Sequence, residues 1–216
     1  MMASTWSVAV RRFPDMTVDT PRLRVRPVRA ADADQIASIF ADRQTRRWLP
    51  DPDEHDLLDG PLGHDYLDGS AQPGRDSSGA RDGYAWCTEL AVLRRDSGEG
   101  DHYGIVRRAD QAVIGCLWVR RTDWAVGSTE VMIAVDGGHR GFGVAGEALD
   151  ALAIALLLEQ GLHRVEVRIP PANLPARRVA DKAGFTYEGL LRNAGHVHGE
   201  RVDLQLWSLV AADLRS

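Results

Sequence analysis

The chain has 216 residues, which is enough for one large domain with a substantial core. Its 44% hydrophobic and 26% charged residues are ordinary for a globular protein, and its formal net charge of −5 argues against a general nucleic-acid binder. Two cysteines are too few for a disulfide framework, and no apolar run approaches the roughly 18 residues needed to span a bilayer. The N-terminus shows no secretory signal, so we expect a cytoplasmic protein with no nucleic-acid or membrane partner.

The composition along the chain indicates one domain with an extension and an insertion. We expect residues 1–15 to be a flexible extension and residues 16–216 to be a single domain. Between about residues 50 and 83 the sequence is rich in Pro, Gly, Asp and Ser and carries few large apolar residues. We interpret this stretch as an insertion within the domain.

Elements in the first half are predicted from hydrophobic periodicity. Apolar and charged residues alternate in the first strand, and Ile36, Ile39 and Phe40 recur at helical spacing. In chain order we expect a strand at 23–28, helices from about 32 to 47 and at 84–95, and strands at 103–107, 112–119 and 128–135.

The second half begins with a glycine-rich turn followed by a long helix whose apolar positions keep the 3.6-residue period. That helix is expected to end near residue 160, and it is followed by a strand at 165–168, a helix at 174–182 and strands at 187–192 and 201–209. The order predicts an α/β (α+β) fold. We expect a mixed, mostly antiparallel sheet of six to seven strands with helices on both faces.

The glycine-rich turn admits a dinucleotide-binding interpretation. Residues 141–146 satisfy G-x-G-x-x-G, and Glu166 lies where such a fold places its ribose-binding acid. Against this, residues 136–140 separate the preceding strand from the first glycine, and too few residues follow Glu166 for further βαβ units.

A second interpretation is a phosphate cradle of the form Arg/Gln-x-x-Gly-x-Gly/Ala, met by Arg140, Gly143 and Ala145. Glycines let the backbone approach a phosphate closely, and the free N–H groups at the start of the next helix point at the anion. An ordinary glycine-rich turn between a strand and a helix remains the structural alternative.

A second motif follows at Asn173–Phe185, with Tyr187-Glu188-Gly189 after it. Together with the turn it resembles the GCN5-related N-acetyltransferase (GNAT) superfamily, and more narrowly the RimJ/RimL-type branch that acetylates ribosomal-protein N-termini. The opening Thr20–Pro27 segment, Val113-Ile114-Gly115 and Gly199–Asp203 are similar to that branch as well.

The resemblance implies a GNAT fold and an enzyme that transfers an acyl group, most simply acetyl from acetyl-CoA, directly to a primary amine. The acceptor would be a peptide or protein N-terminus or a small molecule. By the same resemblance, backbone groups of a strand would line the pantetheine arm and stabilise the developing oxyanion, while the glycine-rich turn would hold the diphosphate. The implied cofactor-binding residues are Ile133, Ala134, Val135, His139, Arg140, Gly141, Phe142, Gly143, Val144, Ala145, Gly146, Asn173, Ala176 and Lys182.

Catalytic roles are harder to assign. Glu130, on the expected central strand, is our candidate base for the attacking amine, with a solvated strand acid as the alternative. The positions at which the family places a proton donor for the leaving thiolate hold Ala176 and Ala180 here. CoA thiol can leave as a thiolate, and Tyr187 is a candidate substitute donor.

Acceptor contacts are expected from Trp48, Trp118 and His196. His196 and His198 lie two apart, yet no third ligand is evident, so we expect no metal. We expect a monomer or homodimer. The missing donor keeps open a non-catalytic CoA-binding or scaffold protein, and a wider groove would admit a longer donor such as succinyl-CoA.

Overall fold

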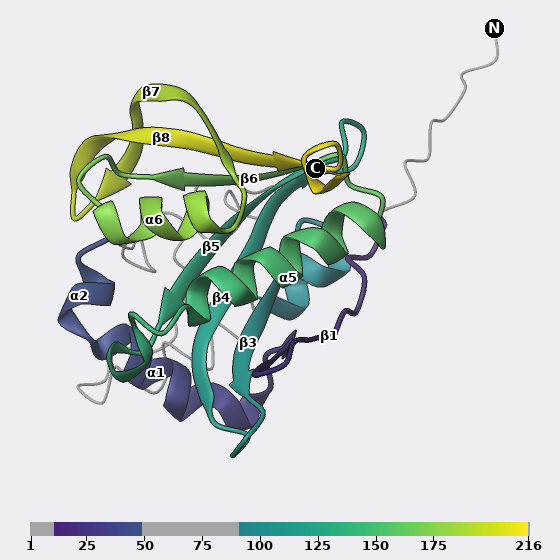
Figure 1. The fold of residues 1–216 in the computed structure, drawn as a ribbon, viewed down its shortest axis with the longest axis vertical. Coiled ribbons are helices and arrows are strands. Elements are labelled where there is room, and N and C mark those ends of the chain that lie inside the picture. Colours follow the sequence, from purple (N-terminus) through teal and green to yellow (C-terminus); the bar gives the residue numbers. More distant parts are fainter. Residues whose placement is uncertain (1–10, 49–90, 216) are drawn as a thin grey trace, which may run out of the picture.

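A computed structural model describes residues 11–48 and 91–215 of the chain. Its centre is an eight-stranded sheet in the order β1-β2-β3-β4-β5-β6-β8-β7 (Figure 1). Every neighbouring pair is antiparallel except β5 and β6. The strands are β1 Val18–Asp19, β2 Leu23–Pro27, β3 Asp101–Arg107, β4 Val113–Asp123, β5 Ser128–Val135, β6 Arg164–Ile169, β7 Thr186–Val197 and β8 Glu200–Val210.

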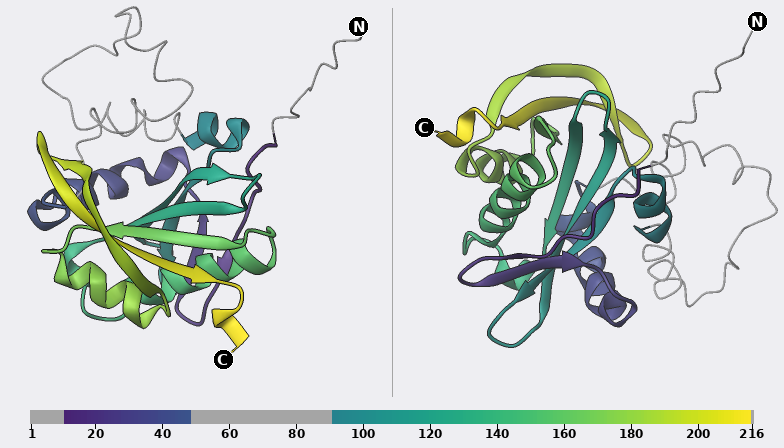
Figure 2. Two further views of the ribbon diagram at one scale, coloured as in Figure 1. Left: turned by 90° about the horizontal axis from the view of Figure 1, so that it is seen from above. Right: turned by 90° about the vertical axis from the view of Figure 1, so that its right-hand side faces the viewer.

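Helices cover both faces of the sheet, as Figure 2 shows from above. One face carries α5 and α6, and the other carries α1, α2 and the helical residues 91–97. The helices are α1 Ala33–Ala41, α2 Arg43–Arg46, α5 Val144–Leu158 and α6 Leu174–Lys182, with short 3-10 turns at η1 Ala30–Asp32, η2 Gly137–His139 and η3 Asp213–Arg215. The predicted mixed sheet with two covered faces is confirmed. The eighth strand is β1, whose two residues are too few for a sequence pattern.

The main core lies between the sheet and α5. Leu149, Leu152 and Leu156 recur on the buried face of α5 and are at most 1% exposed. Burying a leucine side chain contributes about 1.5–3 kcal/mol, so this face alone holds α5 firmly against the strands. A smaller core under α1 contains Ile39, Cys116 and Ala134.

The pairing between β5 and β6 is short. It joins residues 128–130 to residues 164–166, after which no β5–β6 partners follow although β5 continues to Val135 and β6 to Ile169. The two strands therefore diverge into a fork, which opens toward α2 and the start of α6 (Figure 1). Beyond residue 130, the edge of β5 that faces β6 is therefore not paired with that strand.

Two predictions about the N-terminal part are corrected. The helix expected from about 32 to 47 is broken at Asp42, whose extended backbone (φ −62°, ψ 127°) ends α1 and caps α2. The flexible extension does not reach residue 15, because Phe13 is fully buried in the main core and its N–H donates to the Arg95 carbonyl at 2.7 Å. The proposed insertion at 50–83, residues 1–10 and positions 84–90 of the predicted helix lie outside the described residues.

Candidate functional site at the start of α5

The loop between β5 and α5 is shaped by two glycines in the left-handed region, Gly141 (φ 82°) and Gly143 (φ 77°). A Cβ added at Gly141 or at Gly146 would meet nothing within 4 Å, so the space beside both residues is open. The predicted glycine-rich turn therefore leaves free space beside its backbone, which side chains at these positions would occupy.

The first turn of α5 lacks a side-chain cap. Gly143 is the N-cap residue and has no side chain to accept from the helix, whose first internal bond runs from Glu147 N–H to the Gly143 carbonyl at 3.0 Å. The N–H groups of Val144, Ala145 and Gly146 precede that bond and point out of the helix start. Such N–H groups, together with the helix dipole, can bind an anion, and the open space beside Gly141 and Gly146 leaves room for a diphosphate. The residues present thus fit the diphosphate of coenzyme A.

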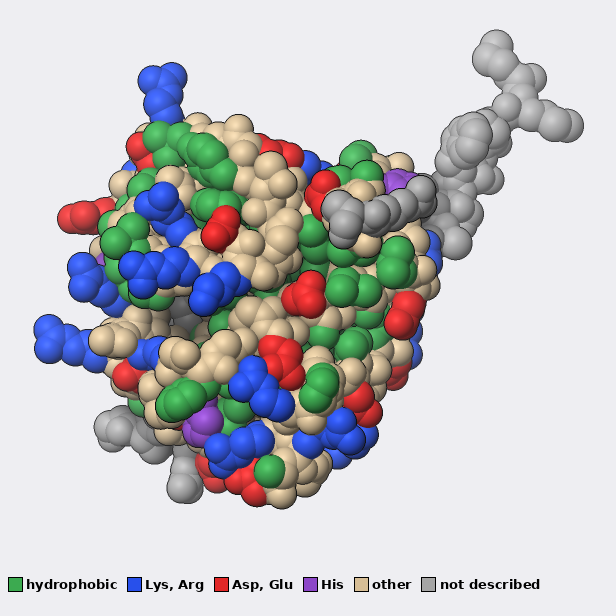
Figure 3. Space-filling view, viewed as in Figure 1, with side chains coloured by type: hydrophobic (Ala, Val, Ile, Leu, Met, Phe, Trp, Pro, Cys, Tyr) green, Lys and Arg blue, Asp and Glu red, His purple; other side chains and the backbone are tan. Residues whose placement is uncertain are grey.

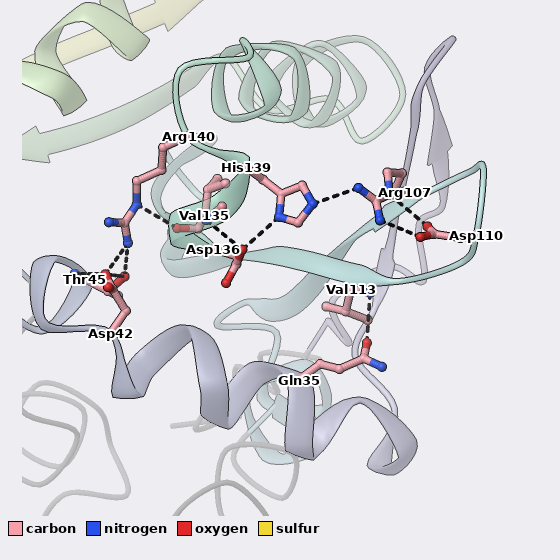
Figure 4. Close-up of polar contacts among 11 residues, drawn as sticks. Gln35, Asp42, Thr45, Arg107, Asp110, Val113, Val135, Asp136, His139 and Arg140 are labelled. Carbon is pink, nitrogen blue, oxygen red and sulfur yellow. Dashed lines mark hydrogen bonds and ion pairs between the residues drawn. The ribbon is translucent and has the colours of Figure 1, made fainter.

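The Arg140 side chain turns away from this helix start toward α2 (Figure 4). Its Nε donates to the Val135 carbonyl at 3.0 Å, and its Nη2 contacts Asp42 at 2.5 Å and Thr45 Oγ1 at 2.6 Å. The bond from Arg140, followed by that from the Thr45 N–H, holds the pKa of Asp42 below its ordinary value. Arg140 therefore fastens the loop to α2, and its side chain is directed away from the proposed anion site.

His139 is part of a polar chain that ties the loop to the β3–β4 hairpin (Figure 4). Arg107 Nη1 lies 2.8 Å from His139 Nε2, and His139 Nδ1 lies 2.8 Å from Asp136 Oδ1. Because a guanidinium can only donate, Nε2 accepts, and Nδ1 carries the proton that it donates to Asp136. Asp110 holds Arg107 from the other side. The imidazole is thus placed as a support for the loop.

Of the three β5 residues expected to line the pantetheine arm, one has the suitable backbone. The Asp136 N–H donates to Ile114 of β4, and groups of successive residues point to opposite strand edges. The backbone groups of Ala134 therefore point to β4, and those of Ile133 and Val135 point into the fork. Since the Val135 carbonyl already accepts from Arg140, Ile133 is left as the residue of the three best placed to meet an extended ligand.

Glu130 lies where the two strands separate, on the sheet face that also carries α1. The residue is 4% exposed, and its carboxylate contacts three guanidinium groups: Arg121 at 3.0 Å, Arg120 at 3.2 Å and Arg168 at 3.5 Å. A buried carboxylate is tolerated when cations pair with it, and these three contacts fix the position of the Glu130 side chain where the strands separate.

The residues expected from the second motif lie at the start of α6 or within it. Asn173 caps that helix, with its side-chain oxygen accepting from the Ala176 N–H at 3.2 Å. Ala176 is half-buried and Ala180 is fully buried against the main core, and as alanines neither can donate a proton. Lys182 is exposed in the last turn. Lys and Arg side chains border a hollow beside α6 in the space-filling view (Figure 3).

Tyr187 lies away from the fork. It is on β7, the outermost strand, with β8 between it and β6, and its ring packs on Trp207 at a centroid distance of 5.4 Å. This position suits packing at the sheet edge and does not support the role of thiolate donor. His196 is also on β7, in the part of the hairpin that extends beyond the end of β6, where it pairs with Arg201.

The two tryptophans occupy different places. Trp118 on β4 is half-buried beside α1. The centre of its ring lies 5.1 Å from the ring centre of Phe40 and 6.3 Å from that of His102. Trp48 follows α2, and the Arg47 guanidinium lies 4.9 Å from the centre of its ring. Trp118 therefore shares the α1 face with Glu130. Trp48 lies just after α2, the helix that the Asp42–Arg140 pair fastens to the loop.

Sequence reasoning missed two sets of supporting residues. Asp42 was absorbed into a continuous helix, although an Asp three residues before Thr45 is a recognisable cap signal. Arg107 was assigned only to a strand, and nothing local indicates its contact with His139.

In the described part of the chain, no group of three or more His, Cys, Asp or Glu is placed to hold a metal ion. No helix among residues 11–48 and 91–215 is long and apolar enough to cross a membrane.

Comparisons with known proteins agree with this geometry. The family model described as "Acetyltransferase (GNAT) domain" matches residues 22–186. The N-acetyltransferase p20 of Bacillus licheniformis, itself uncharacterized, is 24% identical over 194 residues, which cover 90% of this chain and 96% of that protein.

Two solved structures share the fold. RimJ of Mycobacterium smegmatis in complex with CoA-disulfide superposes with a TM-score of 0.74 at 24% identity, covering 94% of this chain and 90% of that one. The ribosomal-protein-S5-alanine acetyltransferase of Vibrio fischeri gives 0.70 at 18% identity, covering 91% and 97%. Since the family model spans most of the sequence, including the loop, the fork and α6, the chain belongs to the GNAT family of N-acetyltransferases.

Proposed function

We propose that this chain transfers an acetyl group from acetyl-CoA to a primary amine at the fork between β5 and β6. The observation that carries the proposal is the start of α5, which has no side-chain cap and has open space beside Gly141 and Gly146, at the end of a strand edge that β6 leaves uncovered. A diphosphate at the helix start and an extended arm along β5 would bring a thioester to the fork. CoA supplies the acyl group there as a thioester.

The residues of the chain would then divide the work. The N–H groups of Val144, Ala145 and Gly146 bind the diphosphate, and the backbone of Ile133 orients the arm and polarises the acyl carbonyl. Glu130 accepts the proton of the attacking amine, directly or through water. The new C–N bond forms as the C–S bond breaks. The sulfur leaves with the electron pair as a thiolate, because a thiol pKa near 8.5 makes a strong acid unnecessary.

The acceptor we propose is an α-amino group at a peptide or protein N-terminus, or a small amine of similar basicity. An α-amino group has a pKa of about 8, so a fraction is already neutral at physiological pH and the base has a modest task. The structural relative from Vibrio fischeri is named for acetylating a ribosomal-protein alanine, which is consistent with this class.

The substitution Gly146→Ala tests the diphosphate site. Gly146 is in the first turn of α5, and alanine is the better helix former by about 0.8–1.0 kcal/mol, so the variant should unfold at a higher temperature. The added methyl would enter the open space proposed for the diphosphate, so calorimetry should show CoA binding weakened by about tenfold or more. A variant that is stabilised and binds CoA as tightly as the original chain would contradict the proposed site.

Turnover is measured separately, as thiol release from acetyl-CoA in the presence of peptides of defined N-terminus and a panel of small amines. Acetylation of at least one amine is the expected result. CoA binding without transfer to any amine would favour a non-catalytic CoA-binding protein, and transfer from succinyl-CoA in preference to acetyl-CoA would change the donor.

A further inference from the structure

The turn between β1 and β2 contacts the start of α5, although more than a hundred residues separate them. Arg22 Nε donates to Glu147 Oε2 at 2.7 Å, its Nη2 also contacts that oxygen, and its Nη1 donates to the Phe142 carbonyl at 3.0 Å. Thr20 Oγ1 donates to the other carboxylate oxygen of Glu147 at 2.5 Å. One arginine thus joins the loop backbone to the first turn of the helix.

Three hydrogen bonds hold the backbone of this turn, from which the Arg22 side chain extends. The Leu23 N–H donates to Thr20 Oγ1 at 2.8 Å, and the Thr20 N–H donates to the Leu23 carbonyl at 2.9 Å. Arg108 Nη1 adds a bond to the Thr20 carbonyl at 2.8 Å. Arg22 Nη2 would be 3.6 Å from a Cβ added at Gly143, which places the charge beside the helix N-cap.

Glu147 poses an electrostatic problem at this place. Its carboxylate is in the first turn of a helix whose free N–H groups form the anion site, and a second anion there would be repelled. Burial alone would raise the pKa of Glu147, yet the bonds from Thr20 and Arg22 outweigh burial and lower it, so the carboxylate is charged. The positive charge of Arg22 is what cancels it.

We propose that Arg22 and Glu147 are positioning residues for the diphosphate of coenzyme A. Arg22 holds the Phe142–Gly143 backbone in its anion-binding conformation and neutralises Glu147 beside the site, while Glu147 fixes Arg22 in place. The inference rests on the proposed function, because it assumes that the diphosphate lies at the start of α5. It gives the Thr20–Pro27 segment, otherwise only a family resemblance, a physical role.

The test compares two ligands on the full chain by calorimetry: CoA, and pantetheine, which lacks the diphosphate. Arg22→Ala should weaken CoA binding by about tenfold and leave pantetheine binding unchanged, because the uncancelled Glu147 charge acts on the diphosphate. The double variant Arg22→Ala with Glu147→Gln should recover most of the lost CoA affinity, since the first turn of α5 then carries no carboxylate that repels the diphosphate. A merely structural role would predict further loss in the double variant.

Arg24→Ala is the matched control. Arg24 lies in β2, two residues after Arg22, and forms a similar exposed pair at 2.7 Å with Asp19 instead of with α5, so CoA binding should be unchanged. Arg22→Lys is the control for a variant that fails to fold: it keeps the charge but cannot reach both partners, so its CoA affinity should fall between that of the original chain and that of Arg22→Ala.

Equal losses for CoA and pantetheine, or no loss with Arg22→Ala, would overturn the inference. If the original chain binds no CoA, the proposed function itself fails, whereas CoA binding that Gly146→Ala weakens and Arg22→Ala does not would refute only the positioning role.

Discussion

The two sides of the proposed active site are built by different means. At the start of α5 the anion site consists of backbone N–H groups from one short stretch, and the nearby arginines, Arg22 and Arg140, are paired with carboxylates. On the α1 face of the fork, Glu130 is surrounded by charged side chains from two strands, Arg120 and Arg121 of β4 and Arg168 of β6. The first side should depend on backbone shape, and the second on charge.

The largest effect is expected on the charged side. Glu130→Gln keeps the shape of the side chain but removes its negative charge, so kcat should fall by about 10²–10⁴-fold if Glu130 is the base. CoA affinity, which depends on the other side, should stay within about twofold in calorimetry. The pH–rate profile should lose its acidic limb.

Glu166→Gln is the control for Glu130. Glu166 pairs with Arg164 at 2.7 Å on the neighbouring strand, so its variant perturbs the same charge cluster without touching the proposed base. Equal rate losses in both variants would show that the cluster is structural and would remove Glu130 from the mechanism.

Backbone shape at the anion site is tested by Gly143→Ala with Gly161→Ala as its partner. These glycines flank the two ends of α5 in the left-handed region, at φ 77° and 71°, so each alanine should cost roughly 1–2 kcal/mol of the free energy of unfolding. Only Gly143→Ala should also weaken CoA binding, by about tenfold or more. Similar CoA affinities for the two variants, measured where both are folded, would deny the backbone site.

The contacts of Arg140, which fasten the loop before α5 to α2, are expected to have a smaller effect, on stability. Arg140→Met removes the contacts with Asp42 and Thr45 and the bond to the Val135 carbonyl. Because the ion pair is about one-third exposed, we expect a loss of about 1 kcal/mol in urea unfolding. A loss above about 3 kcal/mol would mean that Arg140 is part of the core.

The smallest effect is a pH dependence at the sheet edge. Hydrogen bonds, first from Arg164 and then from Ser208, lower the pKa of Glu188 from 4.5 to about 2. A lowered pKa means that the unfolded chain binds the proton more readily, so this stabilisation is complete above about pH 4.5 and is lost as the pH falls toward 2. After a discount for solvent exposure, Glu188→Gln should reduce the free energy of unfolding by about 1 kcal/mol at pH 7. The difference should shrink toward zero in urea titrations near pH 2, and a constant difference would contradict the assignment.

Local patterns predicted most of the elements. The strand at 128–135 and the helix at 174–182 have the predicted bounds, because the strand carries a short apolar run and the helix spaces its apolar residues three and four apart, each next to strong turn residues. Where a local pattern was weak or overridden, prediction failed. β1 has two residues, and the helix break at Asp42 is stabilised by Arg140, which is nearly a hundred residues away.

The sequence by itself determined the glycine-rich turn, the helix that follows it and the order of elements, because these depend on residues close together in the chain. Only the tertiary structure decided which side chains meet. It brought Arg22 to Glu147, Arg107 to His139 and three arginines to Glu130, and it placed Tyr187 two strands away from the fork. Such contacts depend on strand order and register, which bring distant segments side by side and leave no periodic trace in the sequence.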